Sequence, residues 1–356
     1  MQWDLCYNEY SFSYEKRMAL VFSFELIRHP NIRYRESLSR LARCELLALL
    51  HALKIDCDVV TESIGNASFL TFECPELSEP ELRDLARHSA VTLMAEKTEG
   101  GLLRPLDVRR PSFLEEDLAE VLKYKGKTGV TFTKMMLNMA RSLLSPLPES
   151  GRPLLVADPV CGKGTTLFCA LENGDNALGL EQDAKCVREA REYFKKYLEF
   201  HRLKHQARSL SETAGKEAVP VWECTFSRDA GAGRGPLSRT LRLACGDTSL
   251  LPFLARKGKA DLLVGDLPYG IQHAPQGGGK IETFRRLLHR ALPCWVQALR
   301  PGGVVALSYN TLTLSPQAIR EELRAAGLSV VDDEPFLFLR HEVEHAVVRD
   351  IAFAVK

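Results

Sequence analysis

Apolar runs and amphipathic helical stretches alternate through the second half of the chain. The apolar runs predict strands at Leu154–Ala157, Ala177–Leu180, Leu241–Cys245, Asp261–Val264 and Val304–Leu307. Helical patterns follow the first two runs; the second of them carries the stripe Val187, Ala190, Phe194 and Leu198. This alternation is typical of a parallel sheet with helices on both faces. We therefore expect an α/β fold for residues 128–356.

Two segments depart from the alternation. Residues 202–240 are polar and rich in glycine and arginine, so we interpret them as an insertion. Basic residues gather just before and inside it: Lys195, Lys196, His201, Arg202, Lys204, His205 and Arg208. They fit a solvated helix face and an RNA-phosphate patch equally well. The C-terminal segment holds two strand-like runs, Phe336–Leu339 and Ala346–Val355.

Residues 1–96 carry a separate pattern that predicts a small α+β domain. A strand at Met18–Ile27 precedes a leucine-rich helical stripe, and a hairpin turns at Gly65-Asn66. Ser78 and Glu81 form a capping box at the start of a second helix, and Val91–Ala95 is the closing strand. The order βαββαβ is that of a ferredoxin-like module.

Residues 97–127 are predicted to be a linker with one short helix. The lysines near its end, Lys123, Lys125 and Lys127, favour a solvated face over a contact with an RNA backbone. The next stretch carries a helical stripe of Phe132, Met135, Met136, Met139, Ala140, Leu143 and Leu144. Methionines in such a stripe favour core packing over a cofactor contact.

Two motifs follow predicted strands of the α/β region. Residues 154–166 read LLVADPVCGKGTT, an apolar run followed by an acid and by Gly162 and Gly164, which allow close approach of a ligand. Residues 266–270 read DLPYG and place a carboxylate, a carbonyl and an aromatic ring at the end of a strand. Ligands of α/β sheets bind outside the carboxyl ends of the strands. A planar base with an exocyclic amine would suit these three groups.

Together, DPVCGKGT and DLPYG resemble the motifs of the S-adenosylmethionine-dependent amino-methyltransferases. More narrowly, they resemble those of the THUMP-associated RNA guanine-N2 methyltransferases, over the region from Lys127 to the C-terminus. The resemblance implies a Rossmann-like class I methyltransferase sheet, with the C-terminal strand-like runs as a closing antiparallel hairpin. The region after the ferredoxin-like part is too short for a full THUMP domain, so residues 1–96 either capture RNA or serve for packing or dimerisation.

The resemblance also implies a set of site residues. The expected cofactor-binding residues are Asp158, Pro159, Cys161, Gly162, Gly164, Thr165, Glu181, Gln182, Asp247, Thr248 and Asp266, and the expected catalytic residues are Asp266, Leu267, Pro268 and Tyr269. Glu181 would accept both ribose hydroxyls, with Asp183 as second choice, and Asp247 would accept the adenine amine. Each of these acids also stands where a helix cap could be. Thr128 and Thr131 are further candidates for a wall of the cofactor pocket.

Transfer to an amine requires a nitrogen lone pair that is not delocalised into the base. The Asp266 carboxylate and the Leu267 carbonyl would each accept an amine hydrogen, Tyr269 would stack on the base and Pro268 would fix the turn. The expected reaction is methylation of an exocyclic base amine, with guanine N2 of tRNA or another structured RNA ranked first. DNA adenine-N6 or cytosine-N4 methylation, or a non-catalytic subunit that binds cofactor and positions RNA, are the alternatives. A small activating protein subunit is a further candidate partner.

Residues 341–345 read HEVEH, a match to the zinc-protease pattern. That chemistry needs both histidines on one helix and a third ligand, and Asp350 is the only acid that follows. We interpret HEVEH as the turn of the closing hairpin and expect no metal.

Composition limits the class of protein without identifying it. The chain has 356 residues, 45% of them hydrophobic and 26% charged, with a net charge of +1. A nucleic-acid partner would therefore need local basic patches. The ten cysteines include no CxxC pair, which favours reduced thiols and a cytoplasmic location. We find no apolar run near 18 residues and no secretory signal, so we expect no membrane partner.

Overall fold

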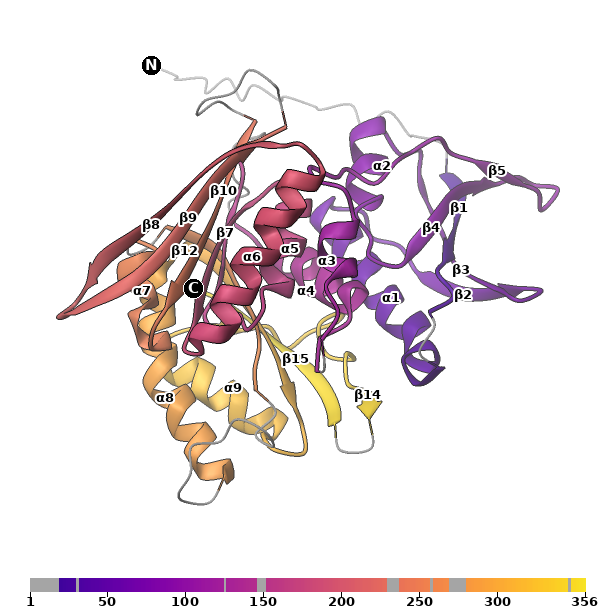
Figure 1. The fold of residues 1–356 in the computed structure, drawn as a ribbon. Helices are drawn as coiled ribbons and strands as arrows, with labels where there is room; N and C mark the ends of the chain where they lie inside the picture. The colour runs from indigo at the N-terminus through magenta and orange to yellow at the C-terminus, as the bar shows by residue number, and fades with distance from the viewer. Residues whose placement is uncertain are drawn as a thin grey trace, which may run out of the picture.

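The computed structural model describes residues 19–29, 32–124, 126–145, 152–228, 237–256, 259–268, 280–344 and 347–356. Within these ranges the strands form a smaller N-terminal sheet and a larger second sheet (Figure 1). Gly270, Pro146, Pro148, Lys125 and the glycines at 231, 233 and 235 lie outside the described residues.

The N-terminal sheet is antiparallel and has the order β2-β3-β1-β4-β5. Its elements are β1 (Ala19–Leu26), α1 (Ile32–Ala52), β2 (Val59–Ile64), β3 (Ala67–Pro75), α2 (Glu79–Leu85), β4 (Val91–Lys97) and β5 (Leu103–Pro105). The first six follow one another in the predicted order. The capping box of Ser78 and Glu81 is present at the start of α2. Because β5 pairs with β4, the N-terminal sheet continues past residue 96.

The second sheet has the order β13-β15-β12-β11-β6-β7-β10-β9-β8, and β14 pairs with β15. Its central strands are β6 (Leu155–Asp158), β7 (Asn176–Glu181), β10 (Ser238–Cys245), β11 (Ala260–Asp266) and β12 (Leu299–Asn310), which confirm the predicted strands. They run parallel, whereas β15 (Val347–Val355) is antiparallel and lies between β12 and β13 (Ser329–Val330). The result is a Rossmann-like α/β fold with a mixed sheet.

Helices cover both faces of this sheet (Figure 1). One face is covered by α4 (Val130–Ser142), α5 (Thr165–Glu172) and α6 (Ala184–Phe200), and the other by α7 (Leu251–Leu254), α8 (Lys280–Ala298) and α9 (Pro316–Ala325). Apolar side chains of the central strands point alternately to the two layers: Val264 belongs to one core and Leu263 to the other. The sheet is therefore buried on both sides, as parallel sheets usually are.

The expected insertion contains two strands that the sequence analysis did not predict. β8 (Lys204–Ala214) and β9 (Glu217–Ser227) form an antiparallel hairpin that extends the sheet beyond β10. Val221, Cys224 and Phe226 of β9 are buried, whereas most of β8 is exposed. Because β8 is polar, the sequence analysis interpreted the whole segment as an insertion and did not recognise β9 as a strand.

The C-terminal hairpin differs from its prediction. Residues Phe336–Leu339 form no strand; the strand that pairs with β15 is β14 (His341–Glu344). The start of HEVEH is therefore a strand and not a turn, and His345 lies outside the described residues. Leu339, which lies in no strand, and His341, which begins β14, are both buried. The apolar residues before His341 therefore mark a buried segment and not the position of the strand.

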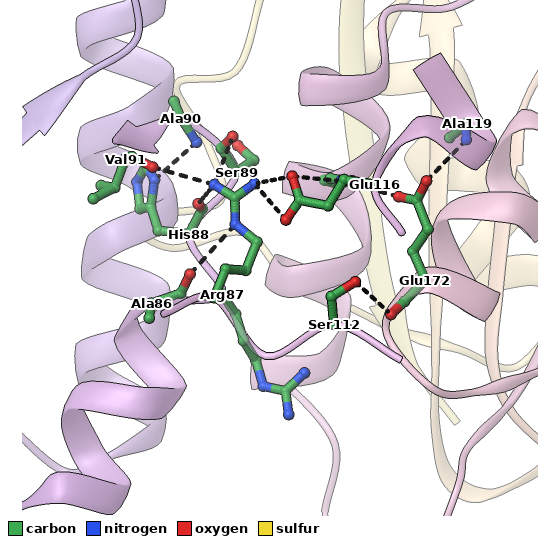
Figure 2. Close-up of polar contacts among 12 residues, drawn as sticks. Ala86, Arg87, His88, Ser89, Ala90, Val91, Ser112, Glu116, Ala119 and Glu172 are labelled. Carbon is green, nitrogen blue, oxygen red and sulfur yellow. Dashed lines mark hydrogen bonds and ion pairs between the residues drawn. The ribbon is translucent and has the colours of Figure 1, made fainter. Parts of the chain in front are cut away.

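The two sheets are joined by a polar junction centred on Glu45 of α1. Glu45 is fully buried and accepts hydrogen bonds from the Ser89 amide (2.8 Å), the Ser89 hydroxyl (2.5 Å) and Asn138 of α4 (2.7 Å). Figure 2 shows the nearby contacts of His88, Glu116 and Glu172, where the linker crosses between the modules. Short helix α3 (Asp117–Val121) is fixed there, since Glu172 accepts from the Ala119 amide at 2.8 Å. The modules are thus tied together by buried groups.

Candidate active site at the carboxyl edge of the central strands

Acidic residues end or follow the central strands at one edge of the sheet. Asp158 ends β6, Glu181 ends β7, Asp266 ends β11, and Asp247 comes shortly after β10. Because these strands are parallel neighbours, their carboxyl ends lie at the same edge. The fold thus brings four of the predicted carboxylates to one edge, as expected for a ligand site of an α/β sheet.

The glycine turn after β6 has the backbone that its sequence requires. Gly162 and Gly164 adopt φ of +52° and +91°, which favour glycine. A Cβ on Gly162 would meet no atom within 4 Å, so the backbone there faces open space. A Cβ on Gly164 would instead lie 3.2 Å from the Phe168 ring. Gly162 therefore leaves room for a ligand, and Gly164 allows α5 to begin against the turn.

Glu181 reaches across to this turn. Its carboxylate accepts from the Gly162 amide at 2.9 Å and from the Asp183 amide at 2.8 Å. Each carboxylate oxygen keeps a further lone pair that could accept a ligand hydroxyl. Asp183, the second choice from sequence, is the N-cap of α6 and accepts from the Lys185 amide. Gln182 is exposed beside it.

Asp247 and Thr248 serve the local structure. Asp247 is the N-cap of the short helix η1 (Thr248–Leu250) and lies 3.1 Å from Arg290 of α8. The Thr248 hydroxyl donates to the Pro159 carbonyl at 2.7 Å and accepts from the Trp295 ring nitrogen at 2.9 Å. These contacts hold the loop after β10 against the loop after β6.

Asp158 is buried at the centre of the edge. Its carboxylate accepts from the Val160 amide at 3.1 Å. Burial, reinforced by the neighbouring Asp266 and Glu181 carboxylates, raises the pKa of Asp158 to about 7, against opposing hydrogen bonds from Val160 and Thr166. A cation bound at this edge would favour the ionised form of Asp158.

Asp266 is held by side chains from three parts of the chain. The Thr128 hydroxyl donates to one carboxylate oxygen, and the Ser308 hydroxyl donates to the other at 2.6 Å. The guanidinium of Arg349 on β15 lies 3.8 Å away. The Leu267 amide donates to the Ser308 carbonyl at 2.9 Å, which fixes the start of the turn. Pro268 follows it, and Tyr269 lies outside the described residues.

Sequence reasoning missed several neighbours of this site. Ser308 and Arg349 lie on strands, where nothing in the sequence marks them. Tyr124 comes from the linker: its hydroxyl lies 2.8 Å from the Thr165 hydroxyl, and Lys163 lies 5.0 Å from its ring centre. Asp158 and Asp266 help to raise the pKa of Tyr124, after burial. The sequence signal that could have indicated Tyr124 is its position four residues before Thr128, which was a candidate for the wall of the cofactor pocket. Thr131 shows no contact with Asp266 among the described residues.

The basic residues between Lys195 and Arg208 include two that form ion pairs within the chain. His201 pairs with Asp117 at 3.1 Å and Arg208 pairs with Glu223 at 2.6 Å. A hollow of about 620 Å³ lies on β8, β9 and the start of β10, away from Asp266. His341 and Glu342 lie on a strand, which does not provide the helical spacing of a zinc-protease motif. The described residues contain no cluster of three metal-ligating side chains and no helix able to cross a membrane.

Comparisons with known proteins give likenesses in structure only. No protein-family model matches the chain, and no curated protein matches it significantly. A putative RNA methyltransferase from Pyrococcus horikoshii is 17% identical with a TM-score of 0.36, and the match covers 68% of this chain and 95% of that one. The rRNA methyltransferase aviRa from Streptomyces viridochromogenes is 13% identical with a TM-score of 0.38, covering 68% and 93%.

A third solved structure, a ribosomal protein L11 methylase from Lactobacillus delbrueckii subsp. bulgaricus, is 16% identical with a TM-score of 0.34, covering 64% and 80%. With TM-scores below 0.5, these likenesses decide neither the fold nor the reaction. The fold rests on the strand order, and the chemistry rests on the side chains at the edge.

Proposed function

We propose that this chain is an S-adenosylmethionine-dependent methyltransferase that methylates an exocyclic base amine, namely guanine N2 of tRNA or another structured RNA. The observation that carries the proposal is the oriented carboxylate of Asp266. Two hydroxyl groups fix it at the edge that also holds Asp158, Glu181 and the open glycine turn. The choice of RNA and of guanine N2 comes from the sequence resemblance.

The residues present suit the cofactor. Gly162 gives backbone access, and Glu181 has lone pairs left for the ribose hydroxyls. The buried carboxylate of Asp158 and the half-buried carboxylate of Asp266 favour a cationic group between them. The bound cofactor would supply an electrophilic methyl group on its sulfonium sulfur.

The protein's part in the reaction is to position the amine. Asp266 accepts one amine hydrogen, and the Leu267 carbonyl accepts another. Both contacts favour a pyramidal nitrogen whose lone pair points away from them. The carboxylate then accepts the proton that the methylated amine releases, directly or through water.

The decisive experiment is tritium transfer from labelled S-adenosylmethionine to small RNA and, separately, to DNA. We expect label on RNA, recovered as N2-methylguanosine, and a loss of about 10²-fold or more in Asp266→Ala. Asp333→Ala, which removes an exposed carboxyl far along the chain, is the matched control. Label on DNA would favour adenine-N6 or cytosine-N4 methylation instead, and cofactor binding without any label would favour the non-catalytic subunit.

Cofactor binding is tested on its own by calorimetry. Glu181→Gln should weaken binding of S-adenosylmethionine by about tenfold or more, since it replaces a charge-assisted hydrogen bond of about 1.5–3 kcal/mol. Glu192→Gln, on the outer surface of α6, should bind as the natural chain does. Equal affinity of all three proteins would contradict the assignment of Glu181.

A further inference from the structure

A buried arginine lies beside the carboxylate that the proposed reaction uses. The side chain of Arg349 on β15 is 6% exposed, and its guanidinium lies 3.8 Å from the Asp266 carboxylate. The same guanidinium lies 4.8 Å from the ring centre of Phe132 on α4. A buried charge is costly unless an opposite charge accompanies it. Because the arginine is buried, salt and water screen this ion pair less than a pair on the surface.

The register of the sheet brings the two residues together. Asp266 of β11 is the register partner of Ser308 on β12. Arg349 of β15 is the partner of Asn310, two residues further along β12. Residues two apart on a strand point to the same face, so the side chains of Asp266 and Arg349 leave the sheet on one face, with a single strand between them. The long arginine side chain crosses that strand.

A second carboxylate stands close to Asp266 without such a cation. A Cβ placed on Gly265, the residue before Asp266, would lie 3.6 Å from Oδ1 of Asp158. Asp158 accepts a hydrogen bond from the Val160 amide, and within the described part of the chain no ion pair reaches it. When two carboxylates are neighbours, their charges repel, and the one beside a positive charge ionises more easily.

Three further titratable side chains interact electrostatically with these charges: His341, Tyr34 and Tyr124. All three are neutral at pH 7, because burial lowers the pKa of the histidine to about 4 and raises the pKa of both tyrosines. Glu181 adds a negative charge on the side of Asp158. The surroundings therefore place positive charge next to Asp266 and more negative charge next to Asp158.

We propose that Arg349 is a positioning residue for the methyl transfer, whose buried charge keeps Asp266 ionised at pH values at which the neighbouring Asp158 is protonated. The inference rests on the proposed function, in which Asp266 accepts the amine hydrogens. As the N–CH₃ bond forms, the S–CH₃ bond breaks with its electron pair left on sulfur, and one amine proton passes to Asp266. Arg349 disfavours the protonated acid, so the proton leaves to water and the carboxylate is restored.

The first test follows both carboxyl groups by NMR in the full chain, labelled with 13C at the aspartate carboxyl carbons. The two signals are assigned by their loss in Asp266→Asn and in Asp158→Asn. In the natural chain, the Asp266 signal should change at a lower pH than the Asp158 signal. Arg349→Met removes the charge and should move the change of the Asp266 signal to higher pH by about one unit or more. Arg349→Lys keeps a charge and should reverse most of that shift.

Arg239 of β10 provides a matched control. Its side chain is also buried, and its guanidinium lies 4.4 Å from an aromatic ring centre, that of Phe113. It donates to the Gly174 carbonyl, at the end of the sheet opposite to Asp266. Arg239→Met should therefore leave the Asp266 signal at its natural position on the pH scale, although it also removes a buried arginine.

The second test is the pH dependence of kcat for methyl transfer to small RNA at saturating cofactor. The rate should fall at acid pH as Asp266 takes up a proton. In Arg349→Met this fall should begin at higher pH, by the shift seen in the NMR titration, and Arg349→Lys should behave like the natural chain. A purely structural contact would instead change the rate by the same factor at every pH.

The NMR titration decides the role of Arg349 separately from the reaction. A shift of the Asp266 signal in Arg349→Met supports the role even if no RNA is methylated. A signal that changes at the same pH in Arg349→Met and in the natural chain overturns it, even if methyl transfer is normal. If Arg349→Met does not fold, the natural chain decides: an Asp158 signal that changes at a lower pH than the Asp266 signal overturns the proposal.

Discussion

At the scale of single residues, the site contains an acid with a raised pKa and glycines with a positive φ. Asp158 is an acid kept partly protonated by burial, and Gly162 and Gly164 adopt a backbone that other residues avoid. Such features cost stability and persist where the surrounding structure fixes them. Two predictions belong to this scale.

The protonation of Asp158 makes the stability of the fold depend on pH. The folded-state pKa of about 7 lies above the ordinary value of 3.8, so between these values the folded chain keeps a proton that the unfolded chain releases. This contribution to stability is complete below about pH 4 and is lost as the pH rises through 7. Asp158→Asn should therefore be more stable than the natural chain at pH 8, by about 1–3 kcal/mol, but not at pH 4. Urea unfolding at both pH values measures the difference; equal differences at the two values would contradict it.

Alanine substitutions at Gly162 and Gly164 should have different effects on stability and on cofactor affinity. Alanine at Gly162 or Gly164 costs about 1–2 kcal/mol of backbone strain, and at Gly164 the contact with Phe168 adds to that cost. Gly164→Ala should thus be the less stable variant, whereas Gly162→Ala should lose more cofactor affinity than its stability explains. Gly327→Ala is the control, because Gly327 has φ of +86° and open space but follows α9, far from the turn. Cofactor affinity equal in Gly162→Ala and Gly327→Ala would refute the role of Gly162.

At the scale of elements, the sequence predicted those strands that are buried on both faces. β6, β7, β10, β11 and β12 appear as apolar runs, since helices cover both faces of the sheet. β8 was missed because it is an exposed edge strand with few apolar positions. Ser308 and Arg349 were missed because their role at Asp266 depends on which strands become neighbours, and no local pattern contains that information.

The hairpin β8–β9 contributes to the core through Phe226. Its ring packs against Phe194 of α6 at 5.3 Å and against Phe113 at 6.2 Å. Phe226→Ala should lower the free energy of unfolding by about 3–4 kcal/mol, because it leaves a cavity beneath the hairpin. Phe200→Ala, whose side chain is 80% exposed, should change it by less than about 0.5 kcal/mol. A small effect at both positions, measured by denaturant unfolding, would show that the hairpin is only loosely attached.

At the scale of the whole molecule, the junction couples the two modules into one unit. α4 contacts α1 of the N-terminal module as well as α5, β11 and β12 of the second sheet. The sequence predicted α4 as a stripe with one apolar face, yet ten of its residues are buried, among them Lys134 and Asn138. The burial of a second face of α4 could not be predicted from the sequence, because α1, which covers that face, belongs to the other module.

Loss of the two hydrogen bonds that Asn138 donates at the junction should therefore destabilise both modules together. Asn138 donates to Glu45 and to the Arg87 carbonyl, each at 2.7 Å, and Asn138→Ala should cost about 2–3 kcal/mol because Glu45 stays buried with one donor fewer. Trp222 and Trp295 report on the second sheet by fluorescence, and far-ultraviolet circular dichroism reports on both modules. The two signals should shift together in Asn138→Ala and stay in place in Gln317→Ala on α9. Separate transitions would indicate two independent modules.

The burial of α4 also limits how such a chain can change in evolution. The boundary between residues 127 and 128 separates two patterns in the sequence, but in the folded chain α4 just beyond it touches both modules. A recombination event that exchanged the N-terminal module would have to supply a surface complementary to α4. We therefore expect the two modules to be inherited together, and new substrates to arise from changes in loops at the edge of the sheet.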